Sequence, residues 1–272
     1  MKLEILMSCM HQSDDTLVRK SRIIGDVLVI NQCGHNGFDV YDTPEGQARM
    51  IFTTDRGLTR SRNMAVANSQ ADVCLLCDDD EVFVPEYEKK ILSAYEELPQ
   101  ADVIIFKMVN RPPSFEDKVM RLKFPMTMKV SSWQISFRRQ SLLDAKIRFD
   151  ELLGAGSGNG AEEELKFLVD CQRAGLQIFY VPTEIASVGQ EESTWFEGFT
   201  EKFFEDRGGT TRYILGAGIA SVYAVYYVLR KKNLYASQIT PTKAMTAIFR
   251  GIRENKVTKQ SRRQAQREKQ GV

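Results

Sequence analysis

The first half of the sequence alternates short apolar runs with segments of helical pattern. This alternation is typical of parallel strands joined by crossover helices, and it constrains the fold more than any other feature. With 272 residues, 43% of them hydrophobic, the chain can bury one sizeable α/β core. We expect strands at residues 3–9, 26–31, 50–53, 73–77, 103–106, 133–138 and 178–181, and helices at 16–24, 59–68, 85–98 and 162–174.

Charge and cysteine content exclude several classes of protein. The formal net charge is +1, so the molecule lacks the basic field of a dedicated nucleic-acid binder, and we expect no nucleic-acid partner. The five cysteines are scattered and mostly lie in apolar runs, which favours buried thiols in a reducing compartment. The N-terminal run contains Glu4 and no small-residue cleavage site follows it, so we interpret it as a strand and expect a cytoplasmic protein.

Three consecutive aspartates, Asp78, Asp79 and Asp80, follow the predicted strand at 73–77. In an open α/β sheet, ligands bind beyond the carboxyl ends of the strands, which is where this cluster lies. Adjacent carboxylates repel one another unless a cation or solvent compensates. Mg²⁺ or Mn²⁺ held by carboxylates and substrate phosphates would supply that compensation. The alternative is a polar strand end or a helix N-cap, for which a single aspartate would suffice.

Four ordered sequence elements resemble family 2 glycosyltransferases. The donor-side elements are residues 56–65, with a Gly-x-Thr-x-Ser-Arg-Asn pattern, and residues 73–80, with an aspartate motif of the D-x-D type. The acceptor-side elements are residues 149–151 and the acidic pair Glu163 and Glu164, followed by Phe167, Gly175 and residues 180–182. The resemblance covers roughly residues 1–200, and it points to transferases of bacterial capsular or exopolysaccharide synthesis.

The resemblance implies a GT-A fold, a Rossmann-like, mostly parallel sheet flanked by helices, with a C-terminal helical extension. It also implies transfer of a sugar with inversion from a nucleotide-diphosphate-sugar, most readily a UDP-sugar, to an acceptor hydroxyl. Asp78 would contact the ribose, and Asp79 or Asp80 would bind Mn²⁺ or Mg²⁺. Glu164, with Glu163 as the alternative, would be the general base. The other expected donor contacts are Ser8, Arg60, Arg62, Asn63 and Asp79, and the acceptor-side candidates are Asp150 and Trp195.

Two of these residue types have an ordinary alternative role. Arg60 and Arg62 match phosphate oxygens in bidentate geometry, but they could equally form a solvated helix face. Asn63 could read a base edge or bind the local backbone.

The C-terminal part differs in character from the rest. We predict a catalytic domain at residues 1–205, with a donor half at 1–110 and an acceptor half at 111–205. An apolar helical extension follows at 206–249, and a basic tail at 250–272. The uncharged run at 213–229 lies at the lower limit for spanning a bilayer, so we favour a buried or interfacial helix. We expect peripheral attachment to the anionic inner face of the membrane, which suits a lipid-linked glycan acceptor.

Two other functions use similar features. A metal-dependent nucleotidyltransferase would also place carboxylates on an α/β sheet, but it usually has a glycine-rich phosphate loop near its first strand, and residues 8–12 have none. A non-catalytic, membrane-associated assembly factor would keep the fold without the intact acidic groups.

Overall fold

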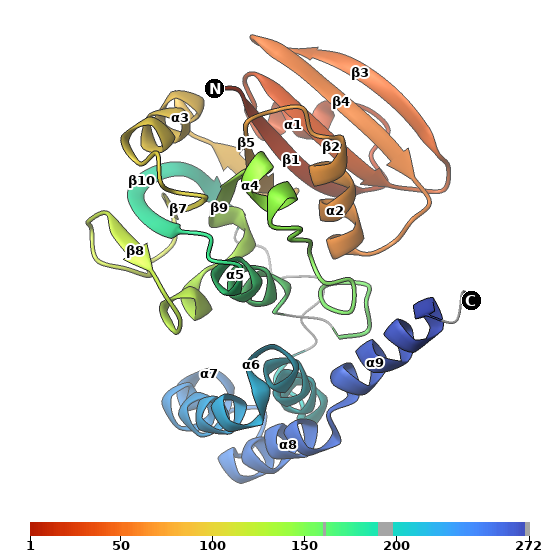
Figure 1. Ribbon diagram of the computed structural model, residues 1–272, viewed down its shortest axis with the longest axis vertical. Coiled ribbons are helices and arrows are strands. Elements are labelled where there is room, and N and C mark those ends of the chain that lie inside the picture. Colours follow the sequence, from red (N-terminus) through yellow and green to blue (C-terminus); the bar gives the residue numbers. More distant parts are fainter. Residues whose placement is uncertain (160–161, 190–197, 270–272) are drawn as a thin grey trace. The chain divides into compact units, whose positions relative to one another are not determined.

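The computed structural model describes residues 1–159, 162–189 and 198–269, with side chains described through residue 267 (Figure 1). The chain forms two compact units. The first comprises Met1–Phe149 and Glu164–Gln190, and the second comprises Asp150–Glu163 and Glu191–Val272. The predicted domain boundary at residue 205 lies inside helix α6 (Glu201–Arg230).

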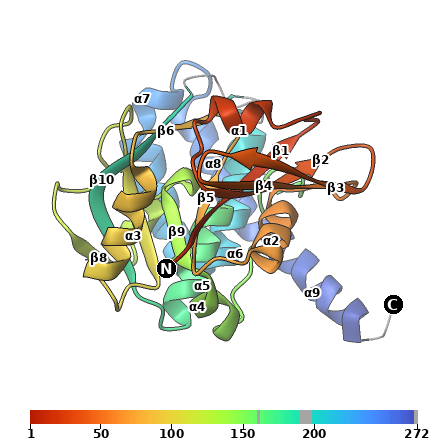
Figure 2. The ribbon, with the colours of Figure 1, turned by 90° about the horizontal axis from the view of Figure 1, so that it is seen from above.

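A single sheet organises the first unit. Its strand order is β3-β4-β2-β1-β5-β9-β7-β10-β6, and β8 pairs with β10. In Figure 2, β3 and β4 lie at one edge of this sheet, and β10 and β6 lie toward the other. The strands are β1 Leu3–Met10, β2 Asp26–Gln32, β3 Gly37–Thr43, β4 Gly46–Thr53, β5 Val73–Cys77, β6 Glu81–Phe83, β7 Val103–Met108, β8 Met120–Leu122, β9 Ile135–Arg138 and β10 Ile178–Val188.

The sheet is mixed, which refines the sequence prediction. Strands β4, β2, β1 and β5 are parallel, as predicted, and β7 pairs with β10 in parallel. The expectation of a mostly parallel sheet does not extend further, because β9 runs antiparallel to both β5 and β7, and β3, β6 and β8 are also antiparallel to their neighbours. The antiparallel strands are short or exposed, so their apolar patterns are weak.

Helices cover both faces of the sheet. Helices α1 (Thr16–Lys20) and α3 (Tyr87–Glu97) pack on the face that includes Ile5 and Met7 of β1. Helices α2 (Leu58–Asn68), α4 (Arg139–Asp144) and α5 (Glu163–Arg173) pack on the opposite face, which includes Leu6. Because alternate residues of a strand point to opposite faces, β1 contributes to both cores and is buried nearly throughout.

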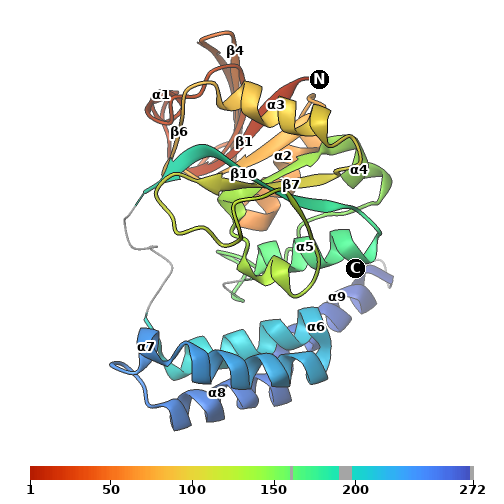
Figure 3. The same cartoon turned by 90° about the vertical axis from the view of Figure 1, so that its left-hand side faces the viewer.

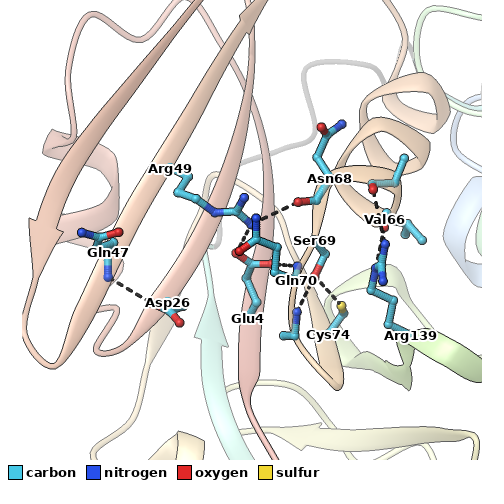
Figure 4. A network of polar contacts seen from close by, with 12 residues as sticks. Glu4, Asp26, Gln47, Arg49, Val66, Asn68, Ser69, Gln70, Cys74 and Arg139 are labelled. Carbon is cyan, nitrogen blue, oxygen red and sulfur yellow. Dashed lines mark hydrogen bonds and ion pairs between the residues drawn. The ribbon is translucent and has the colours of Figure 1, made fainter.

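A polar network fixes the C-terminal end of α2 (Figure 4). The Arg49 guanidinium of β4 donates to a carboxylate oxygen of Glu4 on β1 at 2.6 Å and to the carbonyl of Asn68 at 3.1 Å. The second carboxylate oxygen of Glu4 accepts the Gln70 N–H at 3.2 Å, and Arg139 donates to the Val66 carbonyl at 2.9 Å. These bonds satisfy carbonyls at the helix end, which have no partner within the helix. The N-terminal end of α2 lies at the carboxyl edge of the parallel strands, because α2 follows the end of β4 after a short connection.

All five cysteines are free and buried, which agrees with the sequence prediction. Burial raises the pKa of the Cys74 thiol to about 12, and the pKa of Cys77 is also raised well above its usual value. Thiols held in this neutral form are poor nucleophiles and poor metal ligands. The Cys-x-x-Cys pair therefore belongs to the core of β5.

The second unit is helical. It contains α6, α7 (Lys232–Tyr235), α8 (Pro241–Glu254) and α9 (Lys256–Lys269). Helices α6 and α8 lie side by side (Figure 3). Two glycines allow this approach, because a Cβ on Gly208 would lie 2.0 Å from the Ile248 carbonyl oxygen, and one on Gly251 would lie 1.8 Å from that of Glu205. The predicted basic tail at 250–272 is helical at its start, in the last turn of α8 and in α9.

Candidate active site

The three aspartates lie in a tight connection between two strands. Strand β5 ends at Cys77 and β6 begins at Glu81, so Asp78, Asp79 and Asp80 form the whole connection. Strand β5 is parallel to β1, and the connection therefore follows the carboxyl end of the parallel part of the sheet. We call these three residues the aspartate loop.

Asp78 is held by two side chains from different elements. One carboxylate oxygen accepts from the Arg62 guanidinium of α2 at 3.0 Å, and the other accepts from the Ser132 hydroxyl at 3.0 Å. The Arg62 side chain is only 2% exposed. A buried guanidinium requires such a charged partner, and the pair fixes the position of the aspartate loop relative to α2.

Asp79 and Asp80 are exposed, and neither has a cation paired with it among the ion pairs of the described residues. Partial desolvation and the neighbouring Asp78 carboxylate raise the pKa of Asp79. The same two causes raise the pKa of Asp80, against a smaller opposing effect of Arg111. The folded protein therefore holds two carboxylates in surroundings that disfavour their charge.

Glu81 lies beneath the aspartate loop and is 1% exposed. One carboxylate oxygen accepts the Asp78 backbone N–H at 2.7 Å, and the other has no hydrogen-bond partner within the described chain. Burial raises the pKa of Glu81 well above its usual value, and the Asp78 carboxylate adds to the shift. No role for this fourth acid is predicted from the sequence, although its position directly after the three aspartates is visible there.

The aspartate loop fits a divalent cation held jointly with substrate phosphates. Among the residues that the structure describes, no group of three or more His, Cys, Asp or Glu side chains forms a complete metal site. Mg²⁺ is nevertheless commonly held by one or two carboxylates together with substrate phosphates. Asp79 and Asp80 supply two oxygen ligands of this kind, and a bound cation would stabilise their ionised forms. The donor set therefore fits Mg²⁺ or Mn²⁺.

Phe149 connects the aspartate loop to α5. Its ring stacks on Phe167 of α5 with centroids 4.4 Å apart, and the Arg62 guanidinium lies 5.7 Å from its centroid. The Asn63 amide holds its backbone from both sides, accepting the Phe149 N–H at 2.8 Å and donating to the Phe149 carbonyl at 2.9 Å. Asp78, Arg62, Phe149 and α5 thus form one continuous series of contacts within the first unit.

The other expected donor contacts surround the start of α2. Ser8 of β1 is buried and accepts a hydrogen bond from the Ser61 hydroxyl at 2.8 Å. Arg60, which precedes Ser61 on α2, is exposed. Arg62 and Asn63 are buried, and they bond to Asp78 and to the Phe149 backbone. Three consecutive residues of α2 thus reach different partners: Ser61 bonds to Ser8, Arg62 to Asp78, and Asn63 to the Phe149 backbone. The expected contacts with a donor stay predictions.

The expected acceptor-side residues fall into three groups. Glu163 and Glu164 are the first two residues of α5, with Glu163 buried and Glu164 half-buried. Asp150 begins the segment 150–163 of the second unit, where it accepts from the Tyr213 hydroxyl of α6 at 2.5 Å and from the Leu152 N–H at 3.0 Å. Trp195 lies outside the described residues. The roles of these four residues stay predictions.

A pocket beside the aspartate loop was not predicted. Its wall includes Arg111, Trp133 and Tyr180, and the Arg111 guanidinium lies 5.7 Å from the Trp133 ring centroid. Arg111 also donates to the Gly189 carbonyl at 2.7 Å, and the Gly189 N–H donates to the Asp80 carbonyl at 2.9 Å. The Tyr180 hydroxyl is buried without a hydrogen-bond partner in the described chain. In the sequence Tyr180 is only one member of the predicted acceptor-side motif, and no local signal links it to Arg111.

These features define the GT-A fold, a mixed sheet between helices with acidic residues at its carboxyl edge, joined to a C-terminal helical part. The fold predicted from the sequence is thereby confirmed. The family model described as glycosyl transferase family 2 matches residues 39–151, which include α2 and the aspartate loop.

Solved structures of one bacterial protein have the same fold. The structure of S. aureus TarS residues 1–349 in complex with UDP-GlcNAc superposes with a TM-score of 0.59 at 18% identity, covering 88% of this chain and 74% of that one. The same TarS fragment with UDP gives 0.56 at 15% identity, with the same coverage of both chains. The longer TarS structure gives 0.56 at 14% identity, covering 87% of this chain and 44% of that one. No curated protein sequence matches this chain.

Proposed function

We propose that this protein is an inverting glycosyltransferase that moves a sugar from a UDP-sugar to an acceptor hydroxyl. The observation that carries the proposal is the aspartate loop: three acids at the carboxyl edge of a GT-A sheet, of which Asp78 is neutralised by Arg62 while Asp79 and Asp80 are not. The match to a family 2 glycosyltransferase model supports the reaction class. The TarS complexes with UDP-GlcNAc and UDP support a uridine nucleotide as donor.

The proposed division of labour follows from the residues present. Asp79 and Asp80 would hold Mn²⁺ or Mg²⁺ with the donor diphosphate, and the cation, when bound, offsets the charge of the departing UDP. Asp78, fixed by Arg62 and Ser132, would orient the donor through its ribose. Ser8 on β1 and Arg60 on α2 would add further contacts to the donor.

The transfer itself requires removal of one proton. The acceptor hydroxyl oxygen attacks the anomeric carbon, the bond from that carbon to the diphosphate breaks, and Glu164 takes the hydroxyl proton. A single displacement inverts the anomeric centre. Phe167, one turn further along α5 from Glu164, stacks on Phe149 and so ties the base helix to the same frame as Asp78. We propose Glu163 as the alternative base.

For the acceptor we propose a lipid-linked glycan in the synthesis of a cell-surface polysaccharide, at the cytoplasmic face of the membrane. Asp150 and Trp195 are the proposed acceptor-side residues. The pocket of Arg111, Trp133 and Tyr180 adjoins the aspartate loop and offers an aromatic ring and a guanidinium to a bound glycan.

A thermal-shift experiment tests the donor proposal. UDP and UDP-sugars with Mn²⁺ should raise the melting temperature more than without it, and more than other nucleoside diphosphates do, because ligands that bind only the folded state stabilise it. Asp79→Asn and Asp80→Asn should remove the metal-dependent part and abolish transfer. Asp39→Asn on β3, an exposed aspartate on an edge strand, is the matched control and should behave as wild type. Full metal-dependent stabilisation in both loop variants would refute the assignment.

A further inference from the structure

Helix α6 presents an apolar stripe to solvent. Helical φ/ψ angles are interrupted at Gly216 (φ 81°, ψ 165°), so the segment after it forms a separate helical piece that ends at Arg230. One side of this piece packs against α8 through Ala220, Ala224 and Val228. The opposite side is exposed and consists of Ile219, Val222, Val225, Tyr226 and Leu229. These five residues recur at helical spacing, and we call them the α6 stripe.

The α6 stripe is unusual because its apolar side chains lie on the side of the helix that faces away from α8. Amphipathic helices of soluble proteins place polar residues on the side away from the core. Here Val222 is 72% exposed and Leu229 is 64% exposed, and Leu234 of α7 adds a further exposed side chain at 56%. Isolated exposed apolar residues are ordinary, but a contiguous row marks an interaction surface.

The charge around the stripe identifies the partner. Exposed Arg230, Lys231 and Lys232 follow it directly. Between Asp206 and Glu254 the sequence contains no acidic residue, whereas it contains Arg207, Arg212, Arg230, Lys231, Lys232, Lys243, Arg250 and Arg253. A row of apolar side chains that ends in a basic cluster, within a stretch of sequence free of acidic residues, complements a membrane surface with anionic headgroups.

The geometry favours a helix lying in the interface over one that crosses the bilayer. Within the described part of the chain, α6 alone is long and apolar enough to span a membrane by length and composition, and 33% of its apolar window is buried. A span needs about 20 consecutive apolar residues. The piece from residue 217 to residue 230 is shorter than this, and the piece before Gly216 holds the Arg207–Glu162 ion pair at 3.0 Å.

We propose that the α6 stripe, together with Arg230, Lys231 and Lys232, docks the protein onto an anionic lipid surface, with the second half of α6 lying in the plane of the headgroups. The proposal gives a physical surface to the expected peripheral attachment. It does not depend on the identity of the donor, because none of these residues lies in the first unit.

Vesicle sedimentation with the full chain tests the proposal. The wild-type protein should sediment with vesicles of phosphatidylcholine and phosphatidylglycerol, and much less with phosphatidylcholine alone. Val222→Ser combined with Leu229→Ser should weaken sedimentation about tenfold or more, since each side chain loses most of its transfer free energy. Lys231→Gln combined with Lys232→Gln should weaken it about tenfold at low salt and little at high salt.

The matched control is Phe38→Ser combined with Val40→Ser on β3, which removes two exposed apolar side chains from the first unit and should leave sedimentation unchanged. Circular dichroism should show that every variant is folded, and hydrolysis of the UDP-sugar should stay at the wild-type rate. The proposal is overturned if the wild-type protein sediments with neither kind of vesicle. It is also overturned if the stripe variant, Val222→Ser with Leu229→Ser, sediments like the wild type. A stripe variant that converts a dimer to a monomer in light scattering, with vesicle binding unchanged, would instead assign the stripe to a second copy of the chain.

Discussion

The clamp between Asn63 and Phe149 should be a major source of stability in the first unit. Replacing Asn63 with alanine leaves the Phe149 N–H and carbonyl without their partners, at 2.8 and 2.9 Å, in a site where Phe149 is 2% exposed. An unsatisfied buried polar group costs about 1–3 kcal/mol, so two of them predict a loss of about 2–6 kcal/mol in the free energy of unfolding.

Urea denaturation followed by tryptophan fluorescence and circular dichroism measures this loss. Asn68→Ala is the matched control, because Asn68 is on the same helix but is exposed, and its amide bonds, among the described residues, to the Met64 carbonyl of its own helix alone. The control should lose no more than about 0.5 kcal/mol, as is usual for surface substitutions. If Asn63→Ala is no less stable than Asn68→Ala, the clamp does not have the stabilising role that we assign to it.

Three further predictions concern the base, the aspartate loop and the second unit. Glu164→Gln should lower turnover about 10²-fold or more with little change in donor affinity, measured by steady-state kinetics; the same result in Glu163→Gln would reverse the assignment. Desolvation and the Asp78 carboxylate raise the pKa of Asp80, so ionisation of Asp80 opposes folding. Asp80→Asn should therefore raise the free energy of unfolding at neutral pH, measured by urea titration. This gain should vanish as the pH falls below 3.8, the ordinary pKa of an aspartate, because Asp80 is then protonated in both states. Gly208→Ala should lower the melting temperature of the second unit, because the added Cβ meets the α8 backbone. Gly218→Ala is the matched control: its Cβ would have nothing within 4 Å, and it should raise the melting temperature because alanine favours a helix over glycine by up to about 1 kcal/mol.

The parallel strands and the helices between them were predictable because each is a run of local pattern. Strand β5 is buried at every position, and its sequence is a continuous apolar run. The buried residues of α2 all lie within one continuous helical segment. Strand β3 was missed because it is an exposed edge strand, with polar residues where a buried strand would have apolar ones. Strand β10 continues through Pro182, which the sequence indicated as its end, and irregular pairing with β7 after Val181 accommodates the change.

The candidate site was predictable only in part, for a similar reason. The three aspartates are consecutive in the sequence, as are Arg62 and Asn63 of α2, so both groups are recognisable as motifs. Their inward partners are not local: Ser132 is 54 residues from Asp78, and Phe149 is 86 residues from Asn63. Side chains that bond across such distances carry no periodic signal, so their roles emerge only once the sheet has brought them together.

The clamp at Phe149 has a consequence for how the chain tolerates insertion. The chain leaves the first unit after Phe149 and returns at Glu164, and both ends of this excursion are fastened, by the Asn63 amide on one side and by the Phe149–Phe167 stack on the other. Lengthening a flexible loop between fixed ends is inexpensive, since doubling its length costs only about 0.6 kcal/mol of closure entropy. The first unit should therefore tolerate a longer excursion between Asp150 and Glu163, which keep their proposed roles, while the aspartate loop keeps the same frame.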